Sequence, residues 1–229
     1  LIIATAGNGD HGKTSLIKSL SNQDTDRLPE EKKRKLTIDL GFAEMKLGEN
    51  QIGFIDVPGH QDFIKNMVSG FCAVDLILMV VSADDGWMPQ TEEHLQIISY
   101  LGVKKGIVVL TKTDLIKETN LKINFIRKKI DNSVLANSEI IPFSSKTGDG
   151  LNNLKESILS ALKTLPERKE GSPTRISVDR SFSLKGMGTV ITGTLTGNPL
   201  LINETIGVYP PGKTSRIKAL HNHNQSSDM

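Results

Sequence analysis

The sequence predicts an α/β protein in two parts: a doubly wound, mostly parallel sheet, followed by an incomplete all-β barrel domain. Short aliphatic runs alternate with segments of helical period up to about residue 165, which is typical of a sheet whose strands are connected by helices. Several of these runs are apolar throughout, as expected for parallel strands that are covered on both faces. After residue 165 the runs become rich in Thr and Gly and lose the helical period, which predicts an all-β second domain.

Short runs bounded by Gly, Pro, Asp or Ser are the expected strands of the first domain. They lie at residues 1–5, 51–57, 75–81, 106–110 and 140–143. Apolar residues that recur every three or four positions predict helices over 121–134 and 151–165. In a doubly wound sheet a ligand binds beyond the carboxyl ends of the strands, so the residues that follow each strand are the candidate site.

The chain is expected to divide into a first domain at 1–165, a linker at 166–173 and a partial barrel at 174–229. The linker, PERKEGSP, is polar and contains two prolines and a glycine. Strands are expected over 175–184 and 188–195, whereas the polar tail HNHNQSSDM indicates no closing strand. A segment as short as 174–229 rarely supports a complete barrel without disulfides. We therefore expect the second domain to be incomplete.

Composition excludes several classes of protein. Lys and Arg total 28 and Asp and Glu total 26, so the formal net charge of +2 excludes a histone-like polycation but not a local basic surface for RNA. The single cysteine, Cys72, cannot form an intramolecular disulfide, which fits a reducing compartment. The longest apolar run is too short to span a bilayer, and the first residues lack the pattern of a signal peptide. We therefore expect a cytoplasmic protein without a membrane partner.

A glycine-rich loop supplies the first candidate site. Residues 7–14 match G-x-x-x-x-G-K-[ST], after an expected strand and before a segment that can open a helix. Its backbone N–H groups can approach a polyphosphate, Lys13 would neutralise charge between the β- and γ-phosphates, and the Thr14 hydroxyl would hold Mg²⁺. The alternative is a solvated Gly-rich turn. The expected nucleotide-binding residues are Gly7, Asn8, Gly9, Asp10, His11, Gly12, Lys13, Thr14 and Ser15.

A second motif, DVPGH at 56–60, follows the next strongly apolar strand. The Asp56 carboxylate can reach the same Mg²⁺ through water, and Gly59 can offer its N–H to a γ-phosphate without a side chain in the way. His60 is then the candidate catalytic residue that orients an attacking water. Alone, D-x-P-G would be an ordinary turn. After a phosphate loop it predicts a γ-phosphate sensor.

Two further motifs predict that the base is guanine. After the strand at 106–110 comes TKTD, in which Asp114 can accept hydrogen bonds from guanine N1–H and N2–H, a donor pair that adenine lacks. The aliphatic stem of Lys112 can lie along the base, and Thr111 precedes it. Backbone amides of Ser144, Ser145 and Lys146 can meet the guanine O6. Each string alone would be a surface loop, but four motifs in order at strand ends predict a GTP/GDP site with Mg²⁺.

These residues resemble those of translational GTPases, so the first domain is expected to be a P-loop GTPase that hydrolyses GTP to GDP and phosphate. Within that superfamily, TDRLPEEKKRKLTIDLGF at 25–42 and SVDRSFSLKGMGTVITGT at 177–194 are similar to bacterial selenocysteine-specific elongation factors. The resemblance covers nearly the whole chain. It implies that the GTP form delivers selenocysteinyl-tRNA to the ribosome at recoded UGA codons, with hydrolysis as the release switch. It also implies that the modules which bind an mRNA hairpin lie in C-terminal domains absent from this sequence.

The resemblance assigns further residues. Thr37 would belong to the first switch loop, so the metal-holding residues would be Thr14, Thr37 and, through water, Asp56. Asp179 and Arg180 would lie in the pocket for the selenocysteinyl group, where a guanidinium favours the anionic selenol. On spacing alone, such a pair is more often a structural ion pair.

Some residues depart from the family pattern. Asn8 and Gly9 replace His and Val, which bears on how His60 is gated, and Lys35 replaces a glycine of the switch loop. Thr111 replaces the common Asn, which removes a side-chain amide that braces the phosphate loop. Three other functions remain open: a translational GTPase with another aminoacyl-tRNA, a GTP-binding fragment unable to hold tRNA, and an ATPase.

Overall fold

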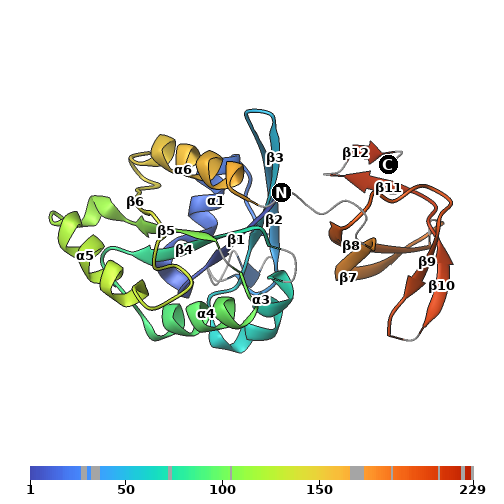
Figure 1. Ribbon diagram of the computed structural model, residues 1–229, viewed down its shortest axis with the longest axis horizontal. Coiled ribbons are helices and arrows are strands. Elements are labelled where there is room, and N and C mark those ends of the chain that lie inside the picture. Colours follow the sequence, from blue (N-terminus) through green and yellow to red (C-terminus); the bar gives the residue numbers. More distant parts are fainter. Residues whose placement is uncertain are drawn as a thin grey trace. The chain divides into compact units, whose positions relative to one another are not determined.

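In the computed structural model, the described residues are 1–26, 30–31, 37–71, 74–103, 105–165, 173–186, 188–210, 212–222 and 225–227. Lys35, Cys72 and nearly all of the expected linker at 166–173 lie outside them. The chain divides into two compact units, Leu1–Leu165 and Pro166–Met229, and each is described by itself (Figure 1).

A six-stranded sheet, with the order β2-β3-β1-β4-β5-β6, forms the centre of the first unit. All neighbouring strands are parallel except β2 and β3, which confirms the predicted mostly parallel sheet. The strands are β1 Ile2–Ala6, β2 Gly41–Leu47, β3 Asn50–Asp56, β4 Leu76–Ser82, β5 Gly106–Thr111 and β6 Ile140–Pro142. The edge strand β2 was not among the strands expected from the sequence, because its polar and apolar residues mix.

Helices cover both faces of this sheet (Figure 1). They are α1 Lys13–Ser21, α3 Ile64–Gly70, α4 Pro89–Tyr100, α5 Thr119–Ile130 and α6 Leu151–Lys163. Apolar residues of α1 and α6 pack with one face, and those of α3, α4 and α5 pack with the other. None of the helices within the described ranges is long and apolar enough to cross a membrane.

The strand β4 shows why the central runs are apolar throughout. All its residues are buried, with Leu78 and Val80 in the cluster on the α1 side and Met79 and Val81 in the cluster on the α4 side. A strand sandwiched between helices has no solvent-facing side, so the alternation of polar and apolar residues disappears.

Short 3-10 turns follow three of the strands at the carboxyl edge of the sheet. They are η1 Gly9–His11 after β1, η2 Gln61–Phe63 after β3 and η3 Thr113–Leu115 after β5. Candidate residues lie in or directly before these turns: Gly9–His11 form η1, His60 precedes η2 and Asp114 belongs to η3. The sheet therefore brings motifs that are distant in sequence to one edge.

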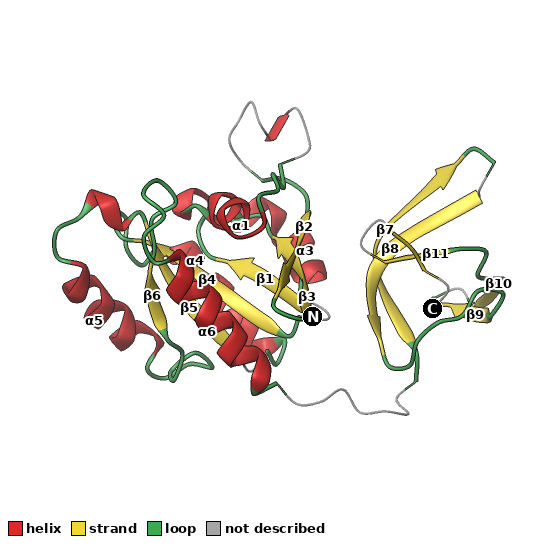
Figure 2. Cartoon of the chain, turned by 90° about the horizontal axis from the view of Figure 1, so that it is seen from above, coloured by secondary structure: helices red, strands yellow, loops and turns green. Residues whose placement is uncertain are grey.

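The second unit is β-rich, as predicted. Its described residues form three antiparallel hairpins, and Figure 2 draws this part of the chain as strands and loops. They pair β7 Arg175–Leu184 with β8 Gly188–Thr196, β9 Thr205–Val208 with β10 Lys213–Arg216, and β11 Leu220–Asn222 with β12 Gln225–Ser227. The tail nevertheless forms the hairpin of β11 and β12, which sequence pattern did not predict because most of its residues are polar. Within the described residues this hairpin pairs only with itself, so the absence of a closing strand stays a prediction.

The described part of the second unit has a thin core. Leu200 and Ile217 are its buried apolar residues, whereas Val178, Phe182 and Ile191 on β7 and β8 are 40–53% exposed. Burial of apolar surface among these residues therefore contributes little to the stability of this unit.

Candidate nucleotide-binding site

The glycine-rich loop connects β1 to α1 and begins with a glycine that no other residue can replace. Gly7 has φ +127°, and a Cβ there would lie 2.2 Å from the carbonyl oxygen of Val80. Its N–H donates to Nδ1 of His94, at 2.9 Å. Gly12, at φ +83°, precedes α1 in the left-handed conformation. The loop therefore wraps around the N-terminus of α1, where unpaired backbone N–H groups favour an anion.

Lys13 bends back over this loop. Its Nζ donates to the carbonyl oxygens of Gly7, at 3.1 Å, and Asn8, at 2.8 Å. The residue is only 3% exposed, and burial lowers the pKa of Lys13 to about 8, although the charges of Asp56 and Asp10 act in the opposite direction. The ammonium group is therefore desolvated and satisfied mainly by carbonyl oxygens.

Asp56 lies at the end of β3 and gathers several hydroxyl groups. Its Oδ1 accepts a hydrogen bond from Thr5, at 2.9 Å, and its Oδ2 accepts from Thr14 and Thr25, each at 2.7 Å. The hydroxyl oxygen of Thr37 lies 3.2 Å from that of Thr14. Two predicted motifs and the predicted switch residue thus meet around one fully buried carboxylate.

Three residues near this cluster had no role predicted from the sequence. The hydroxyls of Thr5 and Thr25 bind Asp56, and Asp26 Oδ1 accepts from the hydroxyl of Thr37 at 3.2 Å. Burial raises the pKa of Asp26, and the charge of Asp56 adds to this effect. Thr25 and Asp26 open the segment 25–42 on which the family resemblance depends, so that segment held a signal for both.

Glu31 also acts on the segment that contains Thr37. Its Oε1 accepts hydrogen bonds from the backbone N–H groups of Ile38 and Asp39, each at 3.1 Å. Glu31 is 3% exposed. In sequence it belongs to a charge run that is typical of a solvated loop, which hid this buried role.

Gly59 lies against the glycine-rich loop. A Cβ at this position would be 2.4 Å from the backbone nitrogen of Gly9 and 2.5 Å from Nζ of Lys13. Only a residue without a side chain allows this approach, so the backbone of the DVPGH motif packs directly against the glycine-rich loop.

His60 is half-exposed, with 41% of its side chain accessible. Its Nδ1 accepts a hydrogen bond from the backbone N–H of Asp62 at 3.4 Å and lies 3.2 Å from the Asp62 carboxylate. Its ring centroid is 6.3 Å from that of Phe63. These contacts of His60 are therefore all with residues of its own turn.

Thr111, at the end of β5, braces the glycine-rich loop. Its hydroxyl donates to the carbonyl oxygen of His11 at 2.6 Å. His11 is buried, its Nδ1 lies 3.2 Å from the Val80 carbonyl oxygen, and burial lowers its pKa. Threonine in place of the common Asn was expected to remove a side-chain amide that braces the loop. The amide is absent, but the shorter hydroxyl keeps a contact between β5 and the loop.

The two motifs assigned to the base also meet. Asp114 Oδ1 accepts a hydrogen bond from the Ser144 hydroxyl at 2.7 Å, although the residues are 30 positions apart. Ser144 is fully buried, and its oxygen accepts from the backbone N–H of Lys146 at 3.2 Å. Ser145 and Lys146 are exposed. The carboxylate of Asp114 is thereby oriented by the following motif.

Lys112 has an unusual backbone conformation, with φ +56°. Its Nζ lies 3.3 Å from Asp84 and 3.6 Å from Asp85, both in the segment between β4 and α4. These half-exposed ion pairs are worth little stability, but they fix the course of the lysine side chain.

Asp179 and Arg180 belong to the second unit. They lie in β7, where the register with β8 shifts between Val178 and Arg180. The side chain of Asp179 is not described. The structure therefore leaves the aminoacyl-pocket assignment of these two residues as a prediction.

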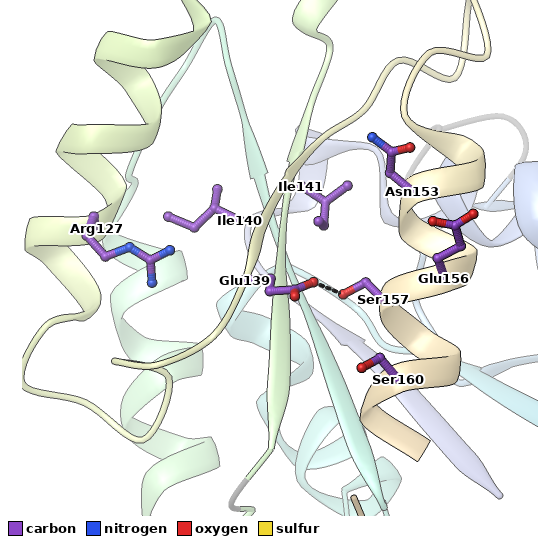
Figure 3. Close-up of a pocket in the computed structure, with 8 residues that line it drawn as sticks. All are labelled: Arg127, Glu139, Ile140, Ile141, Asn153, Glu156, Ser157 and Ser160. Carbon is purple, nitrogen blue, oxygen red and sulfur yellow. Dashed lines mark hydrogen bonds between the residues drawn. The ribbon is translucent and has the colours of Figure 1, made fainter. Parts of the chain in front are cut away.

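A separate groove lies at the edge of the sheet, between α5 and α6 (Figure 3). Its volume is about 500 Å³. Glu139 accepts a hydrogen bond from Ser157, and Arg127 donates to the carbonyl oxygens of Ala136 and Ser138. None of the predicted site residues lines it. The lining is Arg127, Glu139, Ile140, Ile141, Asn153, Glu156, Ser157 and Ser160.

The mostly parallel sheet and the glycine-rich loop after its first strand define the class as an α/β nucleotide-binding domain. The family model of the elongation factor Tu GTP binding domain matches residues 1–164, and the chain belongs to this family.

Among known relatives, the selenocysteine-specific elongation factor of Desulfomicrobium baculatum is 44% identical over the whole chain, which covers 37% of that protein. The crystal structure of a bacterial selenocysteine-specific elongation factor, EF-Sec, superposes with a TM-score of 0.94 at 40% identity, and the match covers the whole chain and 40% of that structure. Elongation factor 1-alpha of Methanothermobacter thermautotrophicus is 30% identical over 97% of the chain and 62% of that protein. The chain thus spans little more than a third of the selenocysteine-specific relative.

Proposed function

We propose that this protein is a GTPase whose GTP form delivers selenocysteinyl-tRNA to ribosomes at recoded UGA codons, and that hydrolysis is the release switch. The observation that carries the proposal is the 44% identity to a selenocysteine-specific factor over both units, against 30% for elongation factor 1-alpha. The contrast favours this cargo over another aminoacyl-tRNA. A cytoplasmic location follows, since translation takes place there.

In this proposal the loop Gly7–Thr14, with Ser15, binds the phosphates. Lys13 would exchange its carbonyl partners Gly7 and Asn8 for phosphate oxygens, which are stronger acceptors because they carry charge. The N-terminus of α1 adds backbone donors. The loop would therefore act as a P-loop, and its binding energy would come from groups that are already in place.

Mg²⁺ is the cation we propose, and the hydroxyl cluster fits it. Two ligands at right angles on Mg²⁺ lie about 3 Å apart, and the Thr14 and Thr37 oxygens are separated by 3.2 Å. Asp56, bonded to Thr14, would reach the ion through water. A cation here would also relieve the repulsion that contributes to the raised pKa of Asp26. When bound, the ion would neutralise charge on the phosphates.

Thr37, Gly59 and His60 would form the switch. Gly59 already lies against Gly9 and Lys13, so its N–H can bind a γ-phosphate when one is present. Loss of that phosphate would release both Thr37 and Gly59. His60 would orient the attacking water. Its half-exposed position fits an enzyme that is slow alone, because the imidazole must turn inward before it can act.

The base site would be built from Thr111, Lys112, Asp114 and the 144–146 motif. One carboxylate oxygen of Asp114 accepts a hydrogen bond from Ser144. This bond would orient the carboxylate toward guanine N1–H and N2–H. Lys112, tied to Asp84, would cover one face of the base. Backbone amides of Ser145 and Lys146 would bind O6.

The second unit would contribute to cargo binding as part of a barrel domain at 174–229, joined to the GTPase domain at 1–165 through the linker 166–173. Asp179 and Arg180 would receive the selenocysteinyl group, because a guanidinium favours an anionic selenol over a neutral hydroxyl. Ribosome binding is part of the same proposal. Contact with an mRNA hairpin would need domains outside this sequence.

Nucleotide selectivity tests the GTPase part. Fluorescent GDP should be displaced from the 229-residue chain by GTP and GDP but not by ATP. Asp114→Asn should lose guanine nucleotides and gain xanthosine nucleotides, whereas the matched control Asp131→Asn, at the exposed end of α5, should behave as the wild type. Equal competition by ATP would contradict the assignment.

Cargo selectivity tests the delivery part. The GTP-bound protein should retain selenocysteinyl-tRNA on a filter and lose seryl-tRNA. Equal retention of both would assign the protein to general translation. Retention of neither, with intact GTP binding, would make this chain a nucleotide-binding fragment.

A further inference from the structure

We propose that His94, on α4, is a positioning residue for the glycine-rich loop. Its imidazole would hold the first peptide group of the loop in the conformation that binds phosphate. This inference depends on the proposed function, since it takes the loop as the nucleotide site. None of the motifs named above includes His94, which lies 87 residues from Gly7 along the chain.

Gly7 is held from both sides. Its N–H donates to Nδ1 of His94 at 2.9 Å, and its carbonyl oxygen accepts from Nζ of Lys13 at 3.1 Å. These two contacts fix the peptide groups before and after the glycine. Since glycine has more conformational freedom than any other residue, its φ of +127° needs such external contacts to stay populated.

The imidazole is suited to this task because it is a buried acceptor. His94 is 1% exposed, and acceptance at Nδ1 requires the proton to be on Nε2. Burial, and then the positive charge of Lys13, lower the pKa of His94 to about 3, so the ring stays neutral near neutral pH. A protonated ring could not accept the bond.

Loss of this acceptor would change the loop before it changes the fold. A buried N–H without a partner is costly, and the peptide between Ala6 and Gly7 can rotate to relieve that cost. Rotation would also redirect the contacts of Gly7 with Lys13. If only about a tenth of the molecules kept the binding conformation, nucleotide affinity would fall about tenfold.

Thr91 provides a matched control on the same helix. It is fully buried, and its hydroxyl has no hydrogen-bond partner among the described residues. Thr91→Val therefore removes a buried polar group from α4 without removing a contact to the loop.

The test measures how tightly purified protein binds two ligands at pH 7.5, and how fast it releases them. The ligands are fluorescent GDP and a fluorescent non-hydrolysable GTP analogue. His94→Leu should weaken both nucleotides by at least about tenfold. His94→Asn should restore the affinity to within about threefold of the wild type, because its Oδ1 takes the place of Nδ1. Thr91→Val should bind as the wild type does. Urea unfolding of each variant checks the fold.

The outcomes separate the two proposals. A wild type that binds no guanine nucleotide would overturn the proposed function itself. If the wild type binds guanine nucleotide and His94→Leu binds it with equal affinity, only the role of His94 is overturned. Should His94→Leu not fold, His94→Gln replaces it, because its acceptor lies near the position of Nε2. If His94→Asn keeps the nucleotide affinity of the wild type and His94→Gln loses it, the inference is supported. If the two variants bind nucleotide equally well, the inference is overturned.

Discussion

The buried imidazole of His94 makes a specific prediction about acid stability. The ring is 1% exposed and accepts the N–H of Gly7, and its pKa is lowered to about 3 by burial and then by Lys13. An unfolded histidine has a pKa of about 6.5. Between these values the unfolded chain takes up a proton that the folded chain does not. The contribution of His94 to the free energy of unfolding is therefore complete above pH 6.5 and is lost as pH falls toward 3.

At pH 5 this linkage should remove about 2 kcal/mol of folding free energy relative to pH 7.5. The comparison is between wild type and His94→Asn, which keeps an acceptor but does not titrate. Other groups, including the buried His11 with its lowered pKa, are common to both proteins and cancel in the difference.

The assay is urea unfolding of nucleotide-free protein at several pH values between 7.5 and 5. Trp87 is the only tryptophan of the sequence and belongs to the first unit, so its fluorescence reports this unit. The stability gap between the variant and the wild type should shift by about 2 kcal/mol in favour of the variant as the pH falls. Parallel curves would refute the reasoning, because they would mean that His94 titrates normally in the folded state.

Three further predictions concern the loop. A bound phosphate should raise the pKa of Lys13 from about 8, so nucleotide binding near pH 8 should take up a proton. Above that pH the nucleotide affinity should fall about tenfold per pH unit. Calorimetric binding heats that do not depend on the buffer would contradict this. Thr111→Val leaves the carbonyl of His11 without its donor and should speed GDP release about tenfold, as measured by stopped flow; an unchanged rate would mean that the brace is unimportant. Gly7→Ala should cost about 3 kcal/mol or more in urea unfolding, because its Cβ would lie 2.2 Å from the Val80 oxygen at φ +127°; a loss below about 1 kcal/mol would contradict the close approach.

Much of the first unit could be predicted because its strands have a simple physical cause. Strands such as β4 are covered on both faces, so they consist of uninterrupted apolar residues that stand out in the sequence. The edge strand β2 and the helices α3 and α4 mix polar and apolar residues and gave no comparable signal. The hairpin of β11 and β12 was missed because backbone pairing forms it without an apolar pattern.

The candidate site divides in the same way. Loops such as Gly7–Thr14 carry their chemistry in consecutive residues, so spacing alone predicts what they can bind. The roles of Thr5 and Thr25 depend on which strand end lies beside Asp56, and that information is not local.

The sequence by itself determined the chemistry of the motifs, the alternation of strands and helices, and the family resemblance, because each depends on residues that are neighbours in the chain. Only the tertiary structure decided the contacts that join the motifs. His94 reaches Gly7 across 87 positions, and Thr111 reaches His11 across 100. Such contacts depend on the order β3-β1-β4-β5 within the sheet and on the packing of α4 against it. Periodicity along the chain indicates which face of an element is buried, but not which element covers it.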